Sequence, residues 1–397
     1  MVEQHGKTLV PQIRFAGFTD PWEQRKVGDF LSESRVKGNT GLNSRKLTVK
    51  LWGKGVIEKN DFGGSEHTQY FIRHKGQFIY SKLDFLNSAF GVIPEKLDGY
   101  ESTADLPAFD LVEMNPHFMF FTAVQEGFYL KHGSAADGSR KAKRIHVNTF
   151  LEMPIMVPTV AEQDFIVEYL QSLDCLITLH QRKYDKLCVL KKSMLDKMFP
   201  KGGSLYPEIR FAGFTDPWEQ RKLGELFEES DERASDREIL SVSVANGIYP
   251  ASESDRETNP GASLANYKIV HFGDVVYNSM RMWQGAVDAS RYDGIVSPAY
   301  VVTRPTSEVY ARFFARLLRQ PMLLKQYQQV SQGNSKDTQV LKFDDFASIR
   351  ISMPASENEQ RQIGAFFDRL DSLITLHQRK LELLRNIKKS MLDKMFV

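Results

Sequence analysis

The sequence Leu-Asp-Cys-Leu-Ile-Thr-Leu-His-Gln-Arg-Lys, beginning at Leu173, opens a stretch that closes with Lys-Lys-Ser-Met-Leu-Asp-Lys-Met-Phe at Phe199. The stretch Leu370–Phe396 repeats it 197 positions later, with Ser372 in place of Cys175 in the opening run and with the same nine closing residues. A long internal repeat fixes the architecture of a chain before any other signal. The 397 residues are therefore two halves of one design.

Each copy of the repeat predicts a long amphipathic helix. Apolar residues recur at heptad spacing, counted from Ile166 in the first copy and from Ile363 in the second. Such a stripe must be covered, and the matching stripe of the other copy is its natural cover, which predicts a coiled-coil pair. The predicted helix-pair contacts are Leu173, Leu176, Ile177, His180 and Leu187 in the first copy, and Leu370, Leu373, Ile374, His377 and Leu384 in the second.

Both helices have a recognisable start and no internal proline. Pro158 precedes Thr159-Val-Ala-Glu162, and Pro354 precedes Ser356-Glu-Asn-Glu359, which are the patterns of capping boxes. From its cap to Phe199 the first helix spans about 40 residues, or roughly 60 Å. His180 and His377 occupy the same heptad position, and a metal or catalytic role is one interpretation. A polar layer that fixes the register of the pair is the other.

The composition is that of a soluble globular protein, with 42% hydrophobic and 26% charged residues. No apolar run reaches membrane length, and the N-terminus lacks the apolar core of a signal peptide. Cys175 and Cys188 lie about 20 Å apart on one predicted helix, which is too far for a disulfide. We therefore expect a cytoplasmic protein. The net charge of +2 is close to balance, so any attraction to nucleic acid must be local.

A second repeat leads into each half of the chain. Pro11–Lys26 returns almost unchanged as Pro207–Lys222. We interpret it as a structural lead-in segment, with Phe15, Phe18 and Trp22 as its anchors.

Two blocks with β-like character, residues 27–157 and 223–353, differ in sequence but share landmarks. Gly76–Ser81 matches Gly273–Asn278 at a shift of 197, and the spacing from Phe150 to Pro158 matches that from Phe346 to Pro354. Pro107-Ala-Phe109 resembles Pro298-Ala-Tyr300. This pattern is typical of one fold that carries two different surfaces.

On these motifs the chain resembles the specificity subunit of type I restriction–modification systems. The paired lead-in segments and the paired helices carry the resemblance, together with Gly273–Ala286 and Asp293–Tyr300 in the second block, and Phe78–Asp84 and Pro107–Asp110 in the first. The resemblance covers essentially the whole chain. It implies that each block binds one half of a split double-stranded DNA sequence, that the helices dock two methyltransferase subunits, and that motor–nuclease subunits join the full complex.

The expected fold is α+β, with two mixed α/β target-recognition domains separated by two long antiparallel coiled-coil helices in a pseudo-two-fold repeat. The expected boundaries are 1–157 for the N-terminal segment with the first target-recognition domain, 158–204 for the central helical spacer, 205–353 for the second target-recognition domain with its lead-in segment, and 354–397 for the C-terminal helical region.

Two kinds of loop are candidates for DNA contact. Lys131–His146 holds five Lys or Arg residues against one Asp in a Gly/Ser-rich setting, which suits phosphate contact and guanine recognition, although a solvated surface loop is the alternative. In the second block, Trp283 could instead belong to the core. The candidate residues are Lys131, His132, Ser139, Arg140, Lys141, Lys143 and Arg144 in the first block, and Arg281, Trp283, Gln284, Asn334, Ser335 and Lys336 in the second.

The sequence has no pattern for catalysis of its own. Gly6-Lys7-Thr8 lacks the upstream glycine of a phosphate-binding loop, no Asn-Pro-Pro-aromatic tetrad of adenine methyltransferases occurs, and no Cys/His cluster has zinc spacing. We therefore expect a non-catalytic DNA-recognition subunit without cofactor or metal. The two alternatives are an enzyme that fuses recognition to methylation or cleavage, and a coiled-coil scaffold that binds no DNA.

Overall fold

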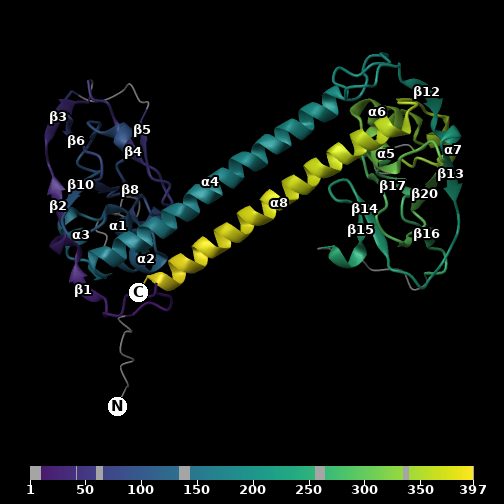
Figure 1. The fold of residues 1–397 in the computed structure, drawn as a ribbon. Coiled ribbons are helices and arrows are strands. Elements are labelled where there is room, and N and C mark those ends of the chain that lie inside the picture. Colours follow the sequence, from purple (N-terminus) through teal and green to yellow (C-terminus); the bar gives the residue numbers. More distant parts are fainter. Residues whose placement is uncertain are drawn as a thin grey trace. The chain divides into compact units, whose positions relative to one another are not determined.

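The structure is a computed structural model, and it describes residues 10–41, 43–59, 66–133, 144–254, 264–333 and 339–396. The chain divides into two compact units, of which unit 1 comprises Met1–His180 with Arg379–Val397 and unit 2 comprises Gln181–Gln378. Each unit holds one β-rich domain together with parts of both long helices (Figure 1).

Domain 1, in unit 1, is built around an antiparallel sheet with strand order β2-β10-β7-β8. Short helices and further two- and three-stranded sheets surround it (Figure 1). Its strands are β1 (Glu23–Lys26), β2 (Leu31–Ser34), β3 (Lys37–Thr40), β4 (Leu47–Val49), β5 (Val56–Glu58), β6 (Gln69–Ile72), β7 (Phe78–Tyr80), β8 (Phe90–Val92), β9 (Glu101–Ser102), β10 (Ala108–Leu111) and β11 (Pro154–Val157). Its helices are α1 (Pro116–Ala123), α2 (Glu126–Gly133), α3 (Val147–Leu151) and the start of α4 (Val160–Lys197).

Domain 2, in unit 2, repeats this sheet as β13-β20-β17-β18. Its strands are β12 (Glu219–Lys222), β13 (Phe227–Ser230), β14 (Leu240–Ser243), β15 (Gly247–Pro250), β16 (Lys268–Val270), β17 (Val275–Asn278), β18 (Val287–Ala289), β19 (Gly294–Val296), β20 (Tyr300–Pro305) and β21 (Arg350–Met353). Its helices are α5 (Ala311–Leu317), α6 (Pro321–Val330), α7 (Phe343–Ser348) and the start of α8 (Glu357–Met395). Two β-rich domains, each followed by a long helix, confirm the predicted fold class and its pseudo-two-fold repeat.

The pairing registers test the shared landmarks one by one. Phe150 and Phe346 are both fully buried, in α3 and α7, as their matched spacing predicts. The match between Pro107-Ala-Phe109 and Pro298-Ala-Tyr300 is wrong by three residues. Phe109 pairs with Phe78, whereas the residue that pairs with the equivalent Val275 is Thr303, not Tyr300. The local likeness is coincidental because strand pairing, not composition, defines equivalence.

The two long helices pack antiparallel within each unit. In unit 1, Lys388 of α8 donates to Asp174 of α4 at 2.5 Å. In unit 2, Lys191 of α4 pairs with Asp371 of α8, also at 2.5 Å. In unit 1 the first half of α4 therefore lies beside the last half of α8. In unit 2 the last half of α4 lies beside the first half of α8. Of the predicted helix-pair residues, Leu173 and Leu370 are buried, Leu176 is exposed, and Ile177, His180, Leu187, Leu373, Ile374, His377 and Leu384 are half-buried.

The end of each helix completes the core of one domain. In unit 1, Phe396 stacks on Phe118 of α1, with ring centroids 5.5 Å apart, and lies edge-on to Trp22. In unit 2, Phe199 stacks on Phe313 at 5.7 Å and lies edge-on to Trp218. Trp22 and Trp218 are buried, so the lead-in segments have the structural role predicted for them.

A buried ion pair fixes each lead-in segment to the first turn of a long helix. Arg14 donates to both carboxylate oxygens of Glu162, at 2.7 and 2.6 Å, and Trp22 Nε1 donates to the same carboxylate. Arg210, Glu359 and Trp218 repeat this arrangement in unit 2. The capping-box prediction is therefore only half right. Thr159 Oγ1 does accept from the Glu162 N–H, but the glutamate side chain binds the arginine instead of returning to the helix start.

Replacing Glu162 by Gln should destabilise the chain by about 3 kcal/mol, because it leaves Arg14 facing a buried site without its charge partner. Urea unfolding of the full chain measures the change in the free energy of unfolding. Glu95→Gln is the matched control, since Glu95 pairs with Lys75 at 2.9 Å on the exposed surface. That control should cost less than about 1 kcal/mol. Equal costs for both variants would contradict a structural role for the buried pair.

Candidate nucleic-acid interface

In each domain the described chain resumes after a polar stretch at an equivalent place beside the main sheet. In domain 1 the chain returns from residues 134–143 at Ile145, whose N–H donates to the Lys82 carbonyl at 3.0 Å, two residues after β7. In domain 2 it returns from residues 334–338 at Leu341, whose N–H donates to the Ser279 carbonyl at 2.9 Å. The residues that follow each polar stretch are therefore fixed to the turn after the central buried strand.

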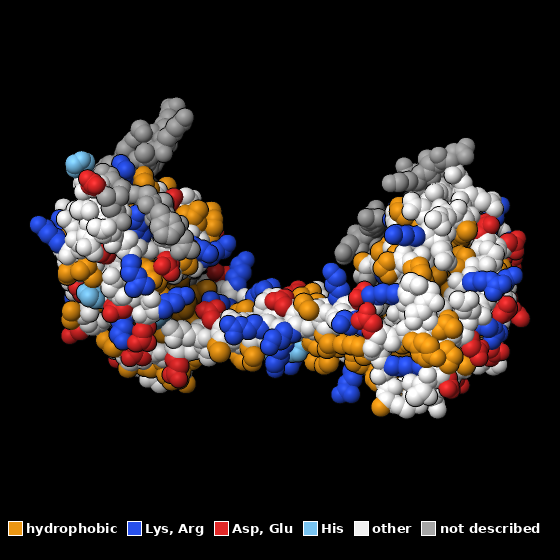
Figure 2. Space-filling view, turned by 90° about the horizontal axis from the view of Figure 1, so that it is seen from above, with side chains coloured by type: hydrophobic (Ala, Val, Ile, Leu, Met, Phe, Trp, Pro, Cys, Tyr) orange, Lys and Arg blue, Asp and Glu red, His pale blue; other side chains and the backbone are white. Residues whose placement is uncertain are grey.

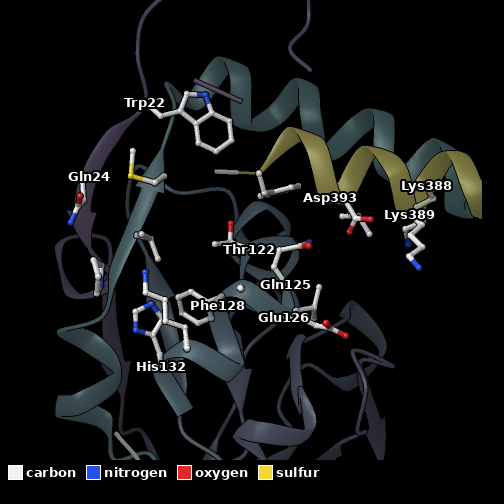
Figure 3. A pocket seen from close by; sticks show the side chains of 18 of the residues that line it. Trp22, Gln24, Thr122, Gln125, Glu126, Phe128, His132, Lys388, Lys389 and Asp393 are labelled. Atoms are coloured by element: carbon white, nitrogen blue, oxygen red, sulfur yellow. The ribbon is translucent and has the colours of Figure 1, made fainter. Parts of the chain in front are cut away.

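In domain 1 the structure separates the predicted DNA-contact residues. Arg144 stands at the base of the loop, with Nε 3.7 Å from a carboxylate oxygen of Asp105. Lys131 and His132, at the end of α2, instead line a pocket of about 1060 Å³ beside the last turns of α8 (Figure 3). The predicted contacts Ser139, Arg140, Lys141 and Lys143 lie outside the described residues.

In domain 2 the turn after β17 presents Arg281 to solvent. Within the described part of the chain, no hydrogen bond or ion pair involves the Arg281 guanidinium. Gln284 is exposed as well, whereas Trp283 is half-buried against the core and its Nε1 donates to the Met280 carbonyl at 3.2 Å. Packing thus accounts for the Trp283 ring. Asn334, Ser335 and Lys336 lie outside the described residues.

The surface charge is distributed, not concentrated. Figure 2 shows Lys and Arg side chains interspersed with Asp and Glu over the visible face of each domain. This agrees with the net charge of +2. Contact with a polyanion would therefore depend on particular loops rather than on a continuous basic face.

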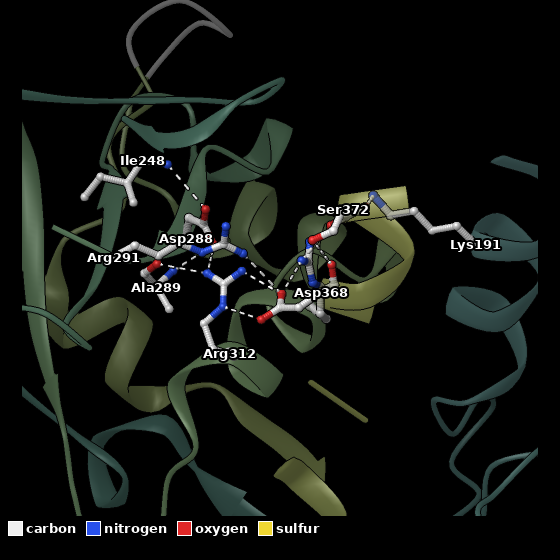
Figure 4. Close-up of polar contacts among 10 residues, drawn as sticks. Lys191, Ile248, Asp288, Ala289, Arg291, Arg312, Asp368 and Ser372 are labelled. Atoms are coloured by element: carbon white, nitrogen blue, oxygen red, sulfur yellow. Dashed lines mark hydrogen bonds and ion pairs between the residues drawn. The ribbon is translucent and has the colours of Figure 1, made fainter. Parts of the chain in front are cut away.

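The most extensive ion network in domain 2 was not apparent from the sequence. Asp368 of α8 accepts from Arg312 at 2.7 and 3.0 Å and from Arg316 at 2.9 Å (Figure 4). Arg312 continues to Asp288 of β18 at 3.4 Å, and Asp288 accepts from the Ile248 N–H of β15. A chain of polar contacts therefore ties the β14–β15 hairpin to α8 (Figure 4).

The network lowers the pKa of the Asp368 carboxyl. Burial alone would raise the pKa of Asp368, but hydrogen bonds and charges from Arg312 and Arg316 outweigh it, and the pKa lies below its ordinary value. A carboxyl with a lowered pKa stabilises the fold above the pKa it has when unfolded, and this contribution disappears as the pH falls through the folded value. The network should hold at neutral pH and weaken only below about pH 4.

Asp368→Asn should destabilise the chain by about 1–2 kcal/mol at pH 7, since two arginines lose a charged acceptor that is partly open to solvent. The difference from the wild type should narrow as the pH falls below about 4. Urea unfolding over a pH series measures this. Glu357→Gln, which removes an exposed pair with Arg361 on the same helix, should change stability by about 0.5 kcal/mol or less. A pH-independent cost for Asp368→Asn would rule out the electrostatic explanation.

Neither a metal-binding cluster nor a membrane-spanning helix occurs among the described residues. No group of three His, Cys, Asp or Glu side chains there is placed to hold a metal ion. No helix in the same ranges is long and apolar enough to cross a membrane.

Comparison with known proteins gives one family match and several similar folds. The model of the type I restriction modification DNA specificity domain matches residues 215–386. The S subunit of a type I restriction–modification system from M. genitalium is similar over 98% of this chain and 99% of its own, with 14% sequence identity and a TM-score of 0.55. The HsdS subunit from Thermoanaerobacter tengcongensis aligns over 94% of this chain and 96% of its own, with 16% identity and a TM-score of 0.47.

Proposed function

We propose that this chain is a DNA specificity subunit of a type I restriction–modification system, and that each of its two domains reads one half of a split DNA sequence. The family match lies in the second half of the chain, and the internal repeat extends its design to the first half. In such complexes this subunit is the non-catalytic one. Membership in a type I complex implies DNA, methyltransferase and restriction subunits as partners.

The observation that carries the proposal is the contrast between the sheets and the loops. The main sheets share one strand order, and the turns after β7 and β17 hold their neighbouring loops through equivalent backbone hydrogen bonds. The loops themselves differ in length and charge. Equal scaffolds with different loops suit the reading of two different half-sites by the expected target-recognition domains, 1–157 and 205–353.

We also propose that the helices dock two identical methyltransferase subunits. The repeat gives two copies of any surface that it encodes, and exposed leucines occur at matching positions. Leu179 of α4 and Leu376 of α8 are each 45% exposed and follow the same Leu-Ile-Thr sequence. Apolar side chains presented twice in the same setting favour two copies of one partner.

Exchanging residues 223–353 for the matching block of a relative should change one half of the methylated sequence and leave the other half unchanged. The reason is that each domain has its own core and its own loops. Methylation sequencing of cells that carry the intact system measures the result. Cells with the reciprocal exchange of residues 27–157 provide the control. If either exchange altered both halves, the two domains would not read DNA independently.

Removing the charges of Arg140, Lys141, Lys143 and Arg144 together should weaken binding to all sequences and reduce the salt slope by about one unit for each phosphate that these side chains neutralise. Arg281→Ala should instead relax a base preference in the second half-site, at a cost of about 1–3 kcal/mol if it contacts a guanine. Binding titrations with the methyltransferase complex over a salt series separate the two effects. Arg361→Ala on α8 is the control. An unchanged slope in the quadruple variant would remove this loop from the DNA interface.

A further inference from the structure

The tip of the β4–β5 hairpin in domain 1 holds a tryptophan in an unusual backbone conformation. The tip is Lys50–Gly55, and Trp52 within it has φ +61°. Two backbone hydrogen bonds hold the tip against the turn after β7. The Trp52 N–H donates to the Asn87 carbonyl at 2.8 Å, and the Gly53 N–H donates to the Ser88 carbonyl at 2.8 Å. The conformation is thus fixed by its surroundings.

This conformation is unfavourable for a bulky side chain, and packing does not offset it. The left-handed region costs an L-residue about 1–2 kcal/mol relative to its normal conformations. The Trp52 side chain remains 60% exposed, while Trp22 and Trp218 are buried. A strained residue that buries little surface is characteristic of functional sites. The ring therefore needs an explanation outside the core of domain 1.

Two basic residues flank Trp52 in the sequence. Lys50 and Lys54 flank the ring and are exposed, and the run from Lys50 to Ile57 contains no acidic residue. An aromatic ring between two cations matches the chemistry of nucleic acids, in which the apolar parts of bases and sugars lie next to phosphates.

The tip and the end of α2, which directly precedes residues 134–143, are linked through one short turn. The turn Phe85–Asn87, whose Asn87 carbonyl accepts the Trp52 N–H, also packs against α2. A Cβ atom built on Gly133 would lie 2.1 Å from Leu86 Cδ2, so the two segments are in direct contact. Gly133 is the last residue before the loop 134–143. The hairpin tip and the end of α2 thus contact the same short turn.

The corresponding hairpin of domain 2 lacks these features. Its tip, between β14 and β15, is Val244-Ala-Asn246, with no lysine and no aromatic ring. There Arg319 donates to the Val244 carbonyl, and Asp288 accepts from Ile248, so side chains of domain 2 hold that tip in place. In domain 1 the position of Asp288 in the strand pair is taken by Gly91, which leaves room for Val56. The tryptophan tip is a property of domain 1 alone.

We propose that Lys50–Gly55 is a DNA-contacting element of the first half-site, in which the Trp52 ring lies against a base or sugar and Lys50 and Lys54 pair with phosphates. This inference rests on the proposed function and adds an element that lies outside the loops predicted from the sequence. Duplex DNA is favoured over a protein partner because two exposed lysines in a run without an acidic residue complement a polyanion.

The test uses the full chain with its cognate methyltransferase subunits and a duplex that carries the site mapped by methylation sequencing. Trp52→Gly should lower the affinity for this duplex roughly 5-fold to 100-fold, the range for removal of one stacked aromatic ring. Its urea midpoint should equal or exceed that of the wild type, because glycine adopts positive φ without strain. The paired substitutions Lys50→Gln and Lys54→Gln should reduce the salt slope by about two units.

Phe272→Ala is the matched control, since Phe272 is 72% exposed in a turn of domain 2 and should leave the affinity unchanged. The inference is overturned if Trp52→Gly binds the duplex as tightly as the wild type. It is also overturned if Trp52→Gly loses methyltransferase subunits on purification, because the ring would then serve a protein interface. A wild-type complex without sequence-specific binding would instead refute the proposed function.

Discussion

The fold depends on the insertion of a helix end into the core of each domain. Met395 and Phe396 close the core around Trp22 in unit 1, and Met198 and Phe199 close the core around Trp218 in unit 2. Burying a phenylalanine contributes about 1.5–3 kcal/mol through the hydrophobic effect alone. Because the residues that follow domain 2 complete the core of domain 1, neither core is complete without the helix end that reaches it. The ion pairs of Arg14 and Arg210 then fix the lead-in segments over the same cores.

Around this shared frame the two domains are stabilised by different polar contacts. In domain 1, Arg73 is buried and donates to Ser102, to the Ser34 carbonyl and to the Leu106 carbonyl, and burial lowers its pKa to about 10. In domain 2 the corresponding position is Val270, and the polar network lies instead between Asp288, Arg312 and Asp368. The repeat therefore preserves the sheet and the helix contacts, while each domain has its own internal supports for its loops.

The features of the fold that depend on periodicity and repetition could be predicted from the sequence. The paired helices, the anchoring tryptophans and the matched phenylalanines of α3 and α7 follow from spacing, because the same pattern occurs twice. The roles of Glu162 and Glu359 were misassigned because a capping glutamate and a buried ion-pair glutamate occupy the same position in the sequence pattern. The Pro107 match failed because three residues of local likeness carry less information than strand register.

The residues that sequence reasoning missed share one property, which is that their contacts are distant in the chain. Asp368 meets Arg312 across 56 positions, and nothing in the helical pattern around Asp368 marks it. Trp52 lies in a short hairpin whose significance depends on backbone conformation and on Asn87, neither of which has a sequence signature. A basic loop, by contrast, can be predicted from composition. Composition does not show which of its side chains contact a ligand.

The insertion of Phe396 into domain 1 also has a consequence for biosynthesis. The residue that fills the core of domain 2 is available early, because Phe199 is synthesised before that domain. Domain 1 has the opposite order, because Phe396 is made 216 residues after His180. At about 5–20 residues per second, the nascent first domain spends roughly 10–40 s with Trp22 and Phe118 lacking their aromatic partner. The N-terminal domain is thus the first to be synthesised and the last to be completed.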